Sequence, residues 1–303
     1  MMSLQISPIA DHIVNNMIMV SGTERSGTTI VGNLIGTAQG VEYSFEPPTL
    51  IALTSIINQC NGNEEKDRLH LLFKAYCYEE LLIGAITGRY LNFNKGDDSY
   101  IMNIKDEIEI HNRLEGKYRK KDIENTIDKI RLAVKLPNAI MALKSLSISF
   151  PTISNVITIR NPNDIINSFL EKKWYNNVSI KSPTVFWPYT ILKDYKVPDW
   201  VPYEKAEWWL SISEIDKIAY HILINWEFIA NLKHKIVVRH EDFVAKPENI
   251  TSQLFESLNL EPTLKTAQVL KKVKNYEIKH YPDVLSRVEE KMRNRLQELF
   301  ACI

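Results

Sequence analysis

The sequence contains few cysteines, no long apolar run and no excess of charge of either sign. Its three cysteines among 303 residues, Cys60, Cys77 and Cys302, lie far apart and match no metal-ligand spacing. A count this sparse and odd is typical of a reducing compartment. We therefore expect neither a metal ligand nor a nucleophile among them, and we expect a cytoplasmic protein.

No uncharged apolar stretch approaches the length that a bilayer span needs. Residues 1–16 lack the basic segment and the apolar run of a signal peptide. The 37 basic residues balance the 37 acidic residues, which argues against binding of nucleic acid through bulk charge. The sequence predicts a soluble protein without a membrane or nucleic-acid partner, and it leaves the oligomeric state open.

Four short apolar runs are typical of buried strands in a parallel sheet. They cover residues 17–20, 132–134, 156–159 and 236–238. A glycine-containing turn and a helical pattern from Thr28 to Ala38 follow the first run, as at the start of a βαβ unit. We therefore predict an α/β fold of three layers, in which helices flank a central parallel sheet.

Longer helical patterns and one proline-rich segment occupy most of the remaining chain. The helical patterns cover residues 64–89, 105–129, 204–232 and 247–258. The segment 176–202 contains four prolines and two tryptophans, which predicts an irregular loop of the kind that forms a lid. No internal repeat divides the chain. We predict a single domain over residues 1–303, with acceptor-site or lid insertions around 61–130 and 176–205.

Basic residues stand at the carboxyl ends of three of the predicted strands. These residues are Lys135, Arg160 and Arg239. Ligands of open α/β sheets bind outside the carboxyl ends of the strands. The pattern therefore predicts an anionic ligand at this edge of the sheet.

The most informative stretch follows the first predicted strand. Gly22 and Gly27 stand five positions apart, as the glycines of a P-loop do, and let successive N–H groups point at an anion. Arg25 adds a guanidinium group, and Thr28 and Thr29 add hydroxyl donors at a helix N-terminus. Thr28 replaces the lysine that meets the β- and γ-phosphates in nucleoside triphosphatases, and no apolar run ends in an aspartate that would hold magnesium. We therefore expect no metal, and a transferred group with less charge than a γ-phosphate, such as a sulfuryl group.

With Arg25, Ser26, Gly27, Thr28 and Thr29 after a buried strand, the chain resembles the sulfotransferases that depend on 3′-phosphoadenylyl sulfate (PAPS), which have a P-loop-containing fold. The resemblance implies that PAPS is the co-substrate and adenosine 3′,5′-bisphosphate the product. It also implies that these five residues hold the 5′-phosphosulfate of PAPS.

Two later segments extend the resemblance. The strand that ends at Arg160, with a proline two residues later and Ser168 eight residues later, is similar to the segment that binds the 3′-phosphate in this family. The resemblance implies that Arg160 and Ser168 bind this phosphate, and Lys172 lies one helical turn beyond Ser168. Residues 236–243 are similar to a late strand of the family, but His240 stands where the family has tyrosine.

The candidates for catalysis are Glu46, Lys135 and Arg25. The Lys-Thr-His motif of the animal cytosolic enzymes is missing, whereas the enzymes that act on carbohydrates and protein tyrosine use a glutamate shortly after the phosphate loop. Glu46 lies at that place, so the resemblance to this group and to the bacterial type implies that Glu46 is the general base, with Glu42 as the fallback. Lys135 resembles a family lysine that we expect to contact the sulfuryl group or the bridging oxygen. Arg25 holds the phosphosulfate or stabilises the leaving group.

Several other residues have simpler interpretations. We expect the basic residues from Arg113 to Lys121 to form a solvated helix face, and Trp208 and Trp209 to belong to the core. We expect Glu241 to have a structural role, in helix capping and ion pairing, rather than a catalytic one. Trp174 is a candidate for stacking on the adenine ring.

The sequence thus predicts transfer of a sulfuryl group to a hydroxyl or nitrogen of a soluble small-molecule acceptor, a natural product or glycan of secondary metabolism. For a cationic acceptor, the second insertion and the helix after it offer acidic residues: Asp194, Asp199, Glu204 and Glu207. Two alternatives stay open, a P-loop nucleotide kinase or other phosphotransferase, and a non-catalytic nucleotide-binding module.

Overall fold

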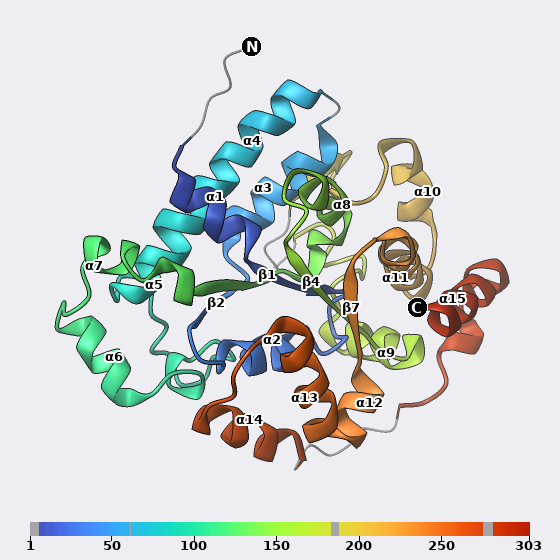
Figure 1. The fold of residues 1–303 in the computed structure, drawn as a ribbon. Helices are drawn as coiled ribbons and strands as arrows, with labels where there is room; N and C mark the ends of the chain where they lie inside the picture. The colour runs from blue at the N-terminus through green and yellow to red at the C-terminus, as the bar shows by residue number, and fades with distance from the viewer. Residues whose placement is uncertain (1–5, 61, 183–187, 275–280) are drawn as a thin grey trace.

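The computed structural model describes residues 6–60, 62–182, 188–274 and 281–303, and a parallel sheet lies at its centre (Figure 1). Its five strands lie in the order β2-β3-β1-β4-β7, and every pairing is parallel. Their bounds are Ile18–Gly22 for β1, Val41–Phe45 for β2, Arg131–Lys135 for β3, Ser154–Ile159 for β4 and Lys235–Arg239 for β7. The four predicted strands and the α/β class are confirmed.

Strand β1 lies in the middle of the sheet, between β3 and β4. Alternate side chains of a strand point to opposite faces, so Ile18 and Val20 pack into one apolar core while Met19 packs into another. All three side chains are fully buried. Burial on both faces explains why the sequence of this strand is a continuous apolar run.

Helices cover both faces of the sheet (Figure 1). The smaller core contains side chains of α2 (Thr28–Gly36), α12 (His240–Ala245), α13 (Pro247–Leu258) and α14 (Leu264–Lys274). The larger core contains side chains of α1 (Pro8–Asn15), α3 (Pro48–Gln59), α4 (Asn63–Ala75), α8 (Ile140–Ser149), α9 (Pro162–Lys172), α11 (Glu214–Asn231) and α15 (Glu290–Cys302). Single turns of 3-10 helix occupy Ile101–Asn103, Ile127–Lys129, Pro137–Ala139, Tyr203–Lys205 and Leu285–Arg287. This arrangement confirms the three predicted layers, and none of the described helices is long and apolar enough to cross a bilayer.

Of the two long helices predicted between residues 61 and 130, one is correct and the other is wrong. Helix α4 continues through a π-helical segment, Tyr76–Ile83, into α5 (Gly84–Ile86), as the pattern over 64–89 predicts. The pattern over 105–129 is divided into α6 (Glu107–Leu114) and α7 (Lys120–Glu124). Between them Gly116 has φ +68°, a left-handed conformation that ends a helix.

The predicted helix over 204–232 is also divided. It consists of α10 (Ala206–Ser211) and α11 (Glu214–Asn231). The hydroxyl of Ser213 accepts a hydrogen bond from the backbone N–H of Asp216 and so caps the start of α11. Hydroxyl residues favour such caps over helix interiors, which explains the break.

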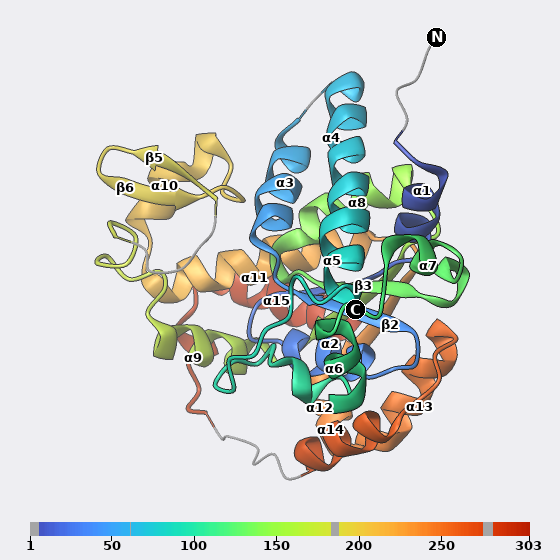
Figure 2. The same ribbon diagram turned by 90° about the vertical axis from the view of Figure 1, so that its left-hand side faces the viewer.

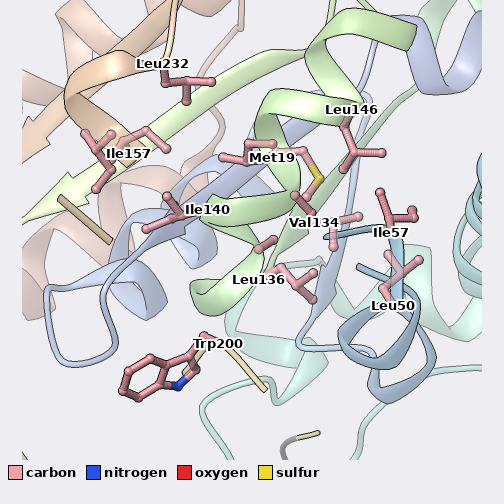
Figure 3. Packing of buried hydrophobic residues seen from close by; sticks show 14 of the residues in the cluster. Met19, Leu50, Ile57, Val134, Leu136, Ile140, Leu146, Ile157, Trp200 and Leu232 are labelled. Atoms are coloured by element: carbon pink, nitrogen blue, oxygen red, sulfur yellow. The ribbon is translucent and has the colours of Figure 1, made fainter. Parts of the chain in front are cut away.

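The proline-rich segment is less irregular than predicted. It contains an antiparallel hairpin of β5 (Tyr189–Leu192) and β6 (Tyr195–Pro198), which stands beside α10 at a distance from the central sheet (Figure 2). Residues 183–187, with one of the two tryptophans, lie outside the described residues. The other, Trp200, is 8% exposed and belongs to the larger core, part of which is shown in Figure 3.

Candidate functional site

A cavity of about 810 Å³ opens at the carboxyl edge of the central sheet. Residues at or just beyond the ends of four strands line it: Gly27, Lys135, Arg160 and His240. This is the edge at which open α/β sheets bind ligands, and the volume is that of an ordinary small-molecule site. The basic edge residue Arg239 is the exception, because its guanidinium donates to the carbonyl of Phe300 at 2.8 Å and does not line the cavity.

The loop between β1 and α2 forms the middle of the cavity wall. Gly27 precedes α2 with φ +95°, and a Cβ atom there would lie 2.7 Å from Nδ1 of His240. No side chain caps this helix end, so the N–H groups of the first turn stay available to a ligand. Thr28 and Thr29 line the cavity, whereas Ser26 is buried and its hydroxyl contacts the hydroxyl of Thr158 at 2.7 Å.

Two arginines meet at this loop. Nε of Arg25 donates to the hydroxyl of Ser168 at 2.8 Å, and a guanidinium nitrogen of Arg160 donates to the carbonyl of Arg25 at 3.3 Å. Arg160 also pairs with Asp164 at 3.3 Å. Arg25, Arg160 and Lys172 line the cavity, but Ser168 is buried behind Arg25. The predicted anchors therefore lie together, and Ser168 orients Arg25 in this structure.

Glu46 and Lys135 form an ion pair on the other side of the loop. The carboxylate of Glu46 accepts from Nζ of Lys135, and the backbone N–H of Glu46 donates to the carbonyl of Lys135 at 3.0 Å. The lysine side chain is 4% exposed, against 36% for the glutamate. Burial lowers the pKa of Lys135, and Glu46 raises it in part. The structure thus brings the predicted base and the predicted lysine together within the cavity.

Two more carboxylates act on Lys135, and the sequence pattern did not indicate them. Glu24 and Asp98 both raise the pKa of this lysine, and both line the cavity. Asp98 lies between α5 and α6, and its backbone carbonyl accepts from the side chain of Asn33 at 2.9 Å. Residues 95–98 are rich in glycine and aspartate, which indicates a turn. The sequence around this turn does not indicate that it contacts α2.

Glu42, the fallback base, has a structural role instead. Arg113 donates to both of its carboxylate oxygens at 2.8 Å, and Nζ of Lys105 lies 3.4 Å from one of them. Burial raises the pKa of Glu42, but the two cations outweigh burial and lower it overall. The prediction that Arg113 lies on a solvated helix face is therefore wrong, because this side chain is buried and joins α6 to β2.

Aromatic side chains form a further wall. Trp174 and Trp200 line the cavity, and Trp200 stacks on His221 with ring centroids 4.4 Å apart. His221 contacts the hydroxyl of Tyr175 at 2.8 Å and lies 3.5 Å from a carboxylate oxygen of Glu24. Burial lowers the pKa of His221 to about 3, so its ring is neutral at pH 7. This buried ring therefore packs the tryptophan wall against α11.

The aromatic and structural predictions have mixed outcomes. Trp209 is buried as predicted, but Trp208 is 41% exposed and lies outside the core. Trp174 lies in the cavity wall, and its contact with adenine stays a prediction. Glu241 accepts from the backbone N–H of Asn161 at 2.7 Å, which joins the ends of β7 and β4 and agrees with a structural role.

His240 lies beside Arg160 at the cavity. Burial, together with the charge of Arg160, lowers the pKa of His240 to about 4. A neutral imidazole therefore stands where the family that the chain resembles has tyrosine. It adds no charge beside Arg160, whose guanidinium lines the cavity while it contacts Asp164 and the carbonyl of Arg25.

The solved structures that are similar to the chain include three sulfotransferases. The sulfotransferase domain from the curacin biosynthetic pathway is 12% identical with a TM-score of 0.48, and the match covers 94% of this chain and 97% of that one. Sulfotransferase STF1 from Mycobacterium tuberculosis H37Rv is 13% identical with a TM-score of 0.41, covering 95% and 76%. Sulfotransferase STF9 from Mycobacterium avium is 11% identical with a TM-score of 0.46, covering 97% and 77%. No protein-family model matches the chain, and no curated protein matches it. The chain is similar to solved sulfotransferases at low identity, and its function has to be inferred from the residues of its cavity.

Proposed function

We propose that the chain transfers the sulfuryl group of PAPS to a hydroxyl or nitrogen of a small acceptor, with Glu46 as the general base. One observation carries the proposal. The phosphate loop follows β1, and Arg160 and Lys135 stand at the ends of the two strands beside β1, all around one cavity. A bisphosphate site on one side of the loop and a base on the other are what this transfer needs.

The residues around the loop fit a nucleotide with two separate phosphate groups. The uncapped N–H groups of the first turn of α2 suit the 5′-phosphosulfate, because an uncapped helix N-terminus binds anions. The absence of a Cβ at Gly27 lets such a ligand approach the backbone closely. Arg160 and Lys172 supply cations for the 3′-phosphate on the side of β4 and α9. Direct contact of Ser168 with this phosphate stays part of the proposal.

The residues of the chain then supply the acid–base and electrostatic steps. PAPS supplies an activated sulfuryl group, whose bond to the 5′-phosphate oxygen breaks as the acceptor oxygen or nitrogen bonds to sulfur. The carboxylate of Glu46 accepts the acceptor's proton, and Lys135 and Arg25 stabilise the charge on the departing phosphate. Because Lys135 also pairs with Glu46, an anionic donor competes for this lysine and leaves Glu46 freer to accept the proton.

The two alternatives have less support. A nucleotide kinase holds the β- and γ-phosphates with a lysine after the second glycine, and Thr28 stands there. A module that only binds nucleotide has no need of a buried lysine paired with a glutamate beside the phosphate loop. Turnover of ATP that needs magnesium and is insensitive to adenosine 3′,5′-bisphosphate would favour the kinase.

Isothermal titration with adenosine 3′,5′-bisphosphate tests the donor site. We expect Arg160→Ala to weaken binding about 10-fold or more, because a hydrogen bond to a charged group contributes roughly 1.5–3 kcal/mol. Arg239→Ala is the matched control, since Arg239 ends the neighbouring strand but turns to the carbonyl of Phe300. No binding by the unchanged protein, or equal losses in both variants, would refute the donor site.

A further inference from the structure

We propose that the acceptor carries an amine or other cationic group that binds the carboxylate of Asp199 beside Trp200. This inference deepens the proposed function, on which it rests, by naming the class of the acceptor. It concerns the part of the cavity between α3 and the end of β6.

Asp199 follows β6 directly and faces the cavity from the hairpin side. Its carboxylate accepts a hydrogen bond from the hydroxyl of Ser55 on α3, and its backbone N–H donates to the carbonyl of Pro188 at 3.1 Å. These bonds hold the carboxylate in place between two elements that are far apart in the sequence. A fixed carboxylate at a cavity wall is a specific binding group for a cation.

The charge of Asp199 has no basic partner within the part of the chain that the structure describes. No ion pair between described residues includes this carboxylate. Burial raises the pKa of Asp199, and only hydrogen bonds from Ser55 and from backbone N–H groups lower it. Because a partly buried carboxylate without a cation is costly, a cationic group on the acceptor gains binding energy here.

Three other carboxylates of the cavity wall interact with a cation. Glu46 pairs with Lys135, and Glu24 and Asp98 act on the same lysine. The acidic groups that the sequence offered together with Asp199 lie elsewhere: Asp194, Glu204 and Glu207 do not line the cavity, and Glu207 pairs with Lys193 on the surface. Asp97 also lines the cavity, but its carboxylate accepts from the backbone N–H and the hydroxyl of Ser99 at 3.0 and 2.9 Å, and these bonds lower its pKa. Burial raises the pKa of Asp199 instead, so Asp199 is the carboxylate of this wall that gains most from a cationic ligand.

The surroundings indicate the rest of the acceptor. Trp200 follows Asp199 and lines the cavity, and an indole face attracts a cation as well as an apolar chain. Ser55 lies seven residues after Pro48, about 10 Å along α3 at 1.5 Å per residue, and Glu46 lies just before that helix. The acceptor is thus expected to carry its nucleophilic atom roughly 10 Å from its cation, across an apolar spacer.

Calorimetric titration of two isosteric probes tests the inference without turnover. The probes are 8-amino-1-octanol and 1-nonanol, added to protein saturated with adenosine 3′,5′-bisphosphate. We expect the unchanged protein to bind the amine at least about 10-fold more tightly than the alcohol, as a charge-assisted hydrogen bond provides. Asp199→Asn removes this preference, and Ser55→Ala reduces it. Asp194→Asn, on the exposed turn of the same hairpin, retains it.

Equal affinity for the two probes, no binding of the amine, or a preference that survives in Asp199→Asn would overturn the inference. Binding of the bisphosphate is measured first in every variant. Loss of this binding in the unchanged protein contradicts the proposed function, whereas intact bisphosphate binding without an amine preference contradicts the acceptor inference alone.

Discussion

Replacement of Glu46 by glutamine separates a general base from a residue that only holds Lys135 in place. The variant keeps the shape of the side chain but removes the proton-accepting group. General base catalysis contributes about 10²–10⁴ to a rate, so we expect kcat for PAPS-dependent sulfation to fall by about that factor. Binding of adenosine 3′,5′-bisphosphate is expected to be retained or tightened, because Lys135 loses the carboxylate that competes with the ligand.

The same substitution also affects stability in a defined way. Lys135 is 4% exposed and loses its charged partner, while Glu46 is 36% exposed and partly screened by water. A hydrogen bond to a charged group contributes roughly 1.5–3 kcal/mol, and we expect a loss near the low end in urea unfolding. Loss of Glu46 also lowers the pKa of Lys135 further, because Glu46 raises it. Below pH 10.5, the ordinary pKa of a lysine, Lys135 then holds its proton less in the folded variant than in the unfolded chain. The free energy of unfolding of the variant therefore rises more steeply with pH in the alkaline range than that of the unchanged protein.

The assay measures release of adenosine 3′,5′-bisphosphate from PAPS with an acceptor that the unchanged protein sulfates. Glu207→Gln is the matched control, because Glu207 forms an exposed ion pair with Lys193 at 3.3 Å outside the cavity. Full activity of Glu46→Gln would refute the assignment of the base. A parallel loss of bisphosphate binding would show that Glu46 is needed to build the site.

Two further predictions concern groups outside the transfer step. His221→Gln is expected to flatten the rise in unfolding free energy between pH 5 and 6.5, because the buried imidazole has a pKa of about 3 and takes up a proton only on unfolding. The difference amounts to at most about 1.4 kcal/mol per pH unit, urea unfolding at several pH values measures it, and an unchanged slope contradicts it. Arg113→Met is expected to lower the free energy of unfolding by about 3–5 kcal/mol, because it leaves Glu42 buried without its main partner. Bisphosphate affinity should stay unchanged in this variant, and a large loss of affinity with full stability would contradict the structural role of Arg113.

The sequence was sufficient for those parts of the fold that local patterns determine. Buried strands such as β1 have continuous apolar sequences because both faces are covered, and α13 begins and ends where its pattern predicts. The convergence of Lys135 and Arg160 on the phosphate loop follows from a general property of parallel sheets, whose carboxyl ends share one edge. The helical patterns over 105–129 and 204–232 are interrupted at single residues, Gly116 and Ser213. These breaks were missed because the apolar periodicity on either side of each residue is that of a continuous helix.

Contacts between distant segments could not be predicted. Nothing near Arg113 in the sequence indicates that Glu42, 71 positions away, accepts its hydrogen bonds. The bond between Ser55 and Asp199 spans 144 positions, and the tryptophan beside it depends on packing against α11. Such pairs are set by the tertiary packing of distant segments rather than by local propensity.

A crystal structure with adenosine 3′,5′-bisphosphate measures the central claim most directly. We expect the 5′-phosphate at the N–H groups of residues 27–29, at the start of α2, and the 3′-phosphate at the guanidinium of Arg160, with Glu46 and Lys135 facing the open part of the cavity. A nucleotide bound elsewhere, or bound in the reverse direction with its 3′-phosphate on the loop, would contradict the account.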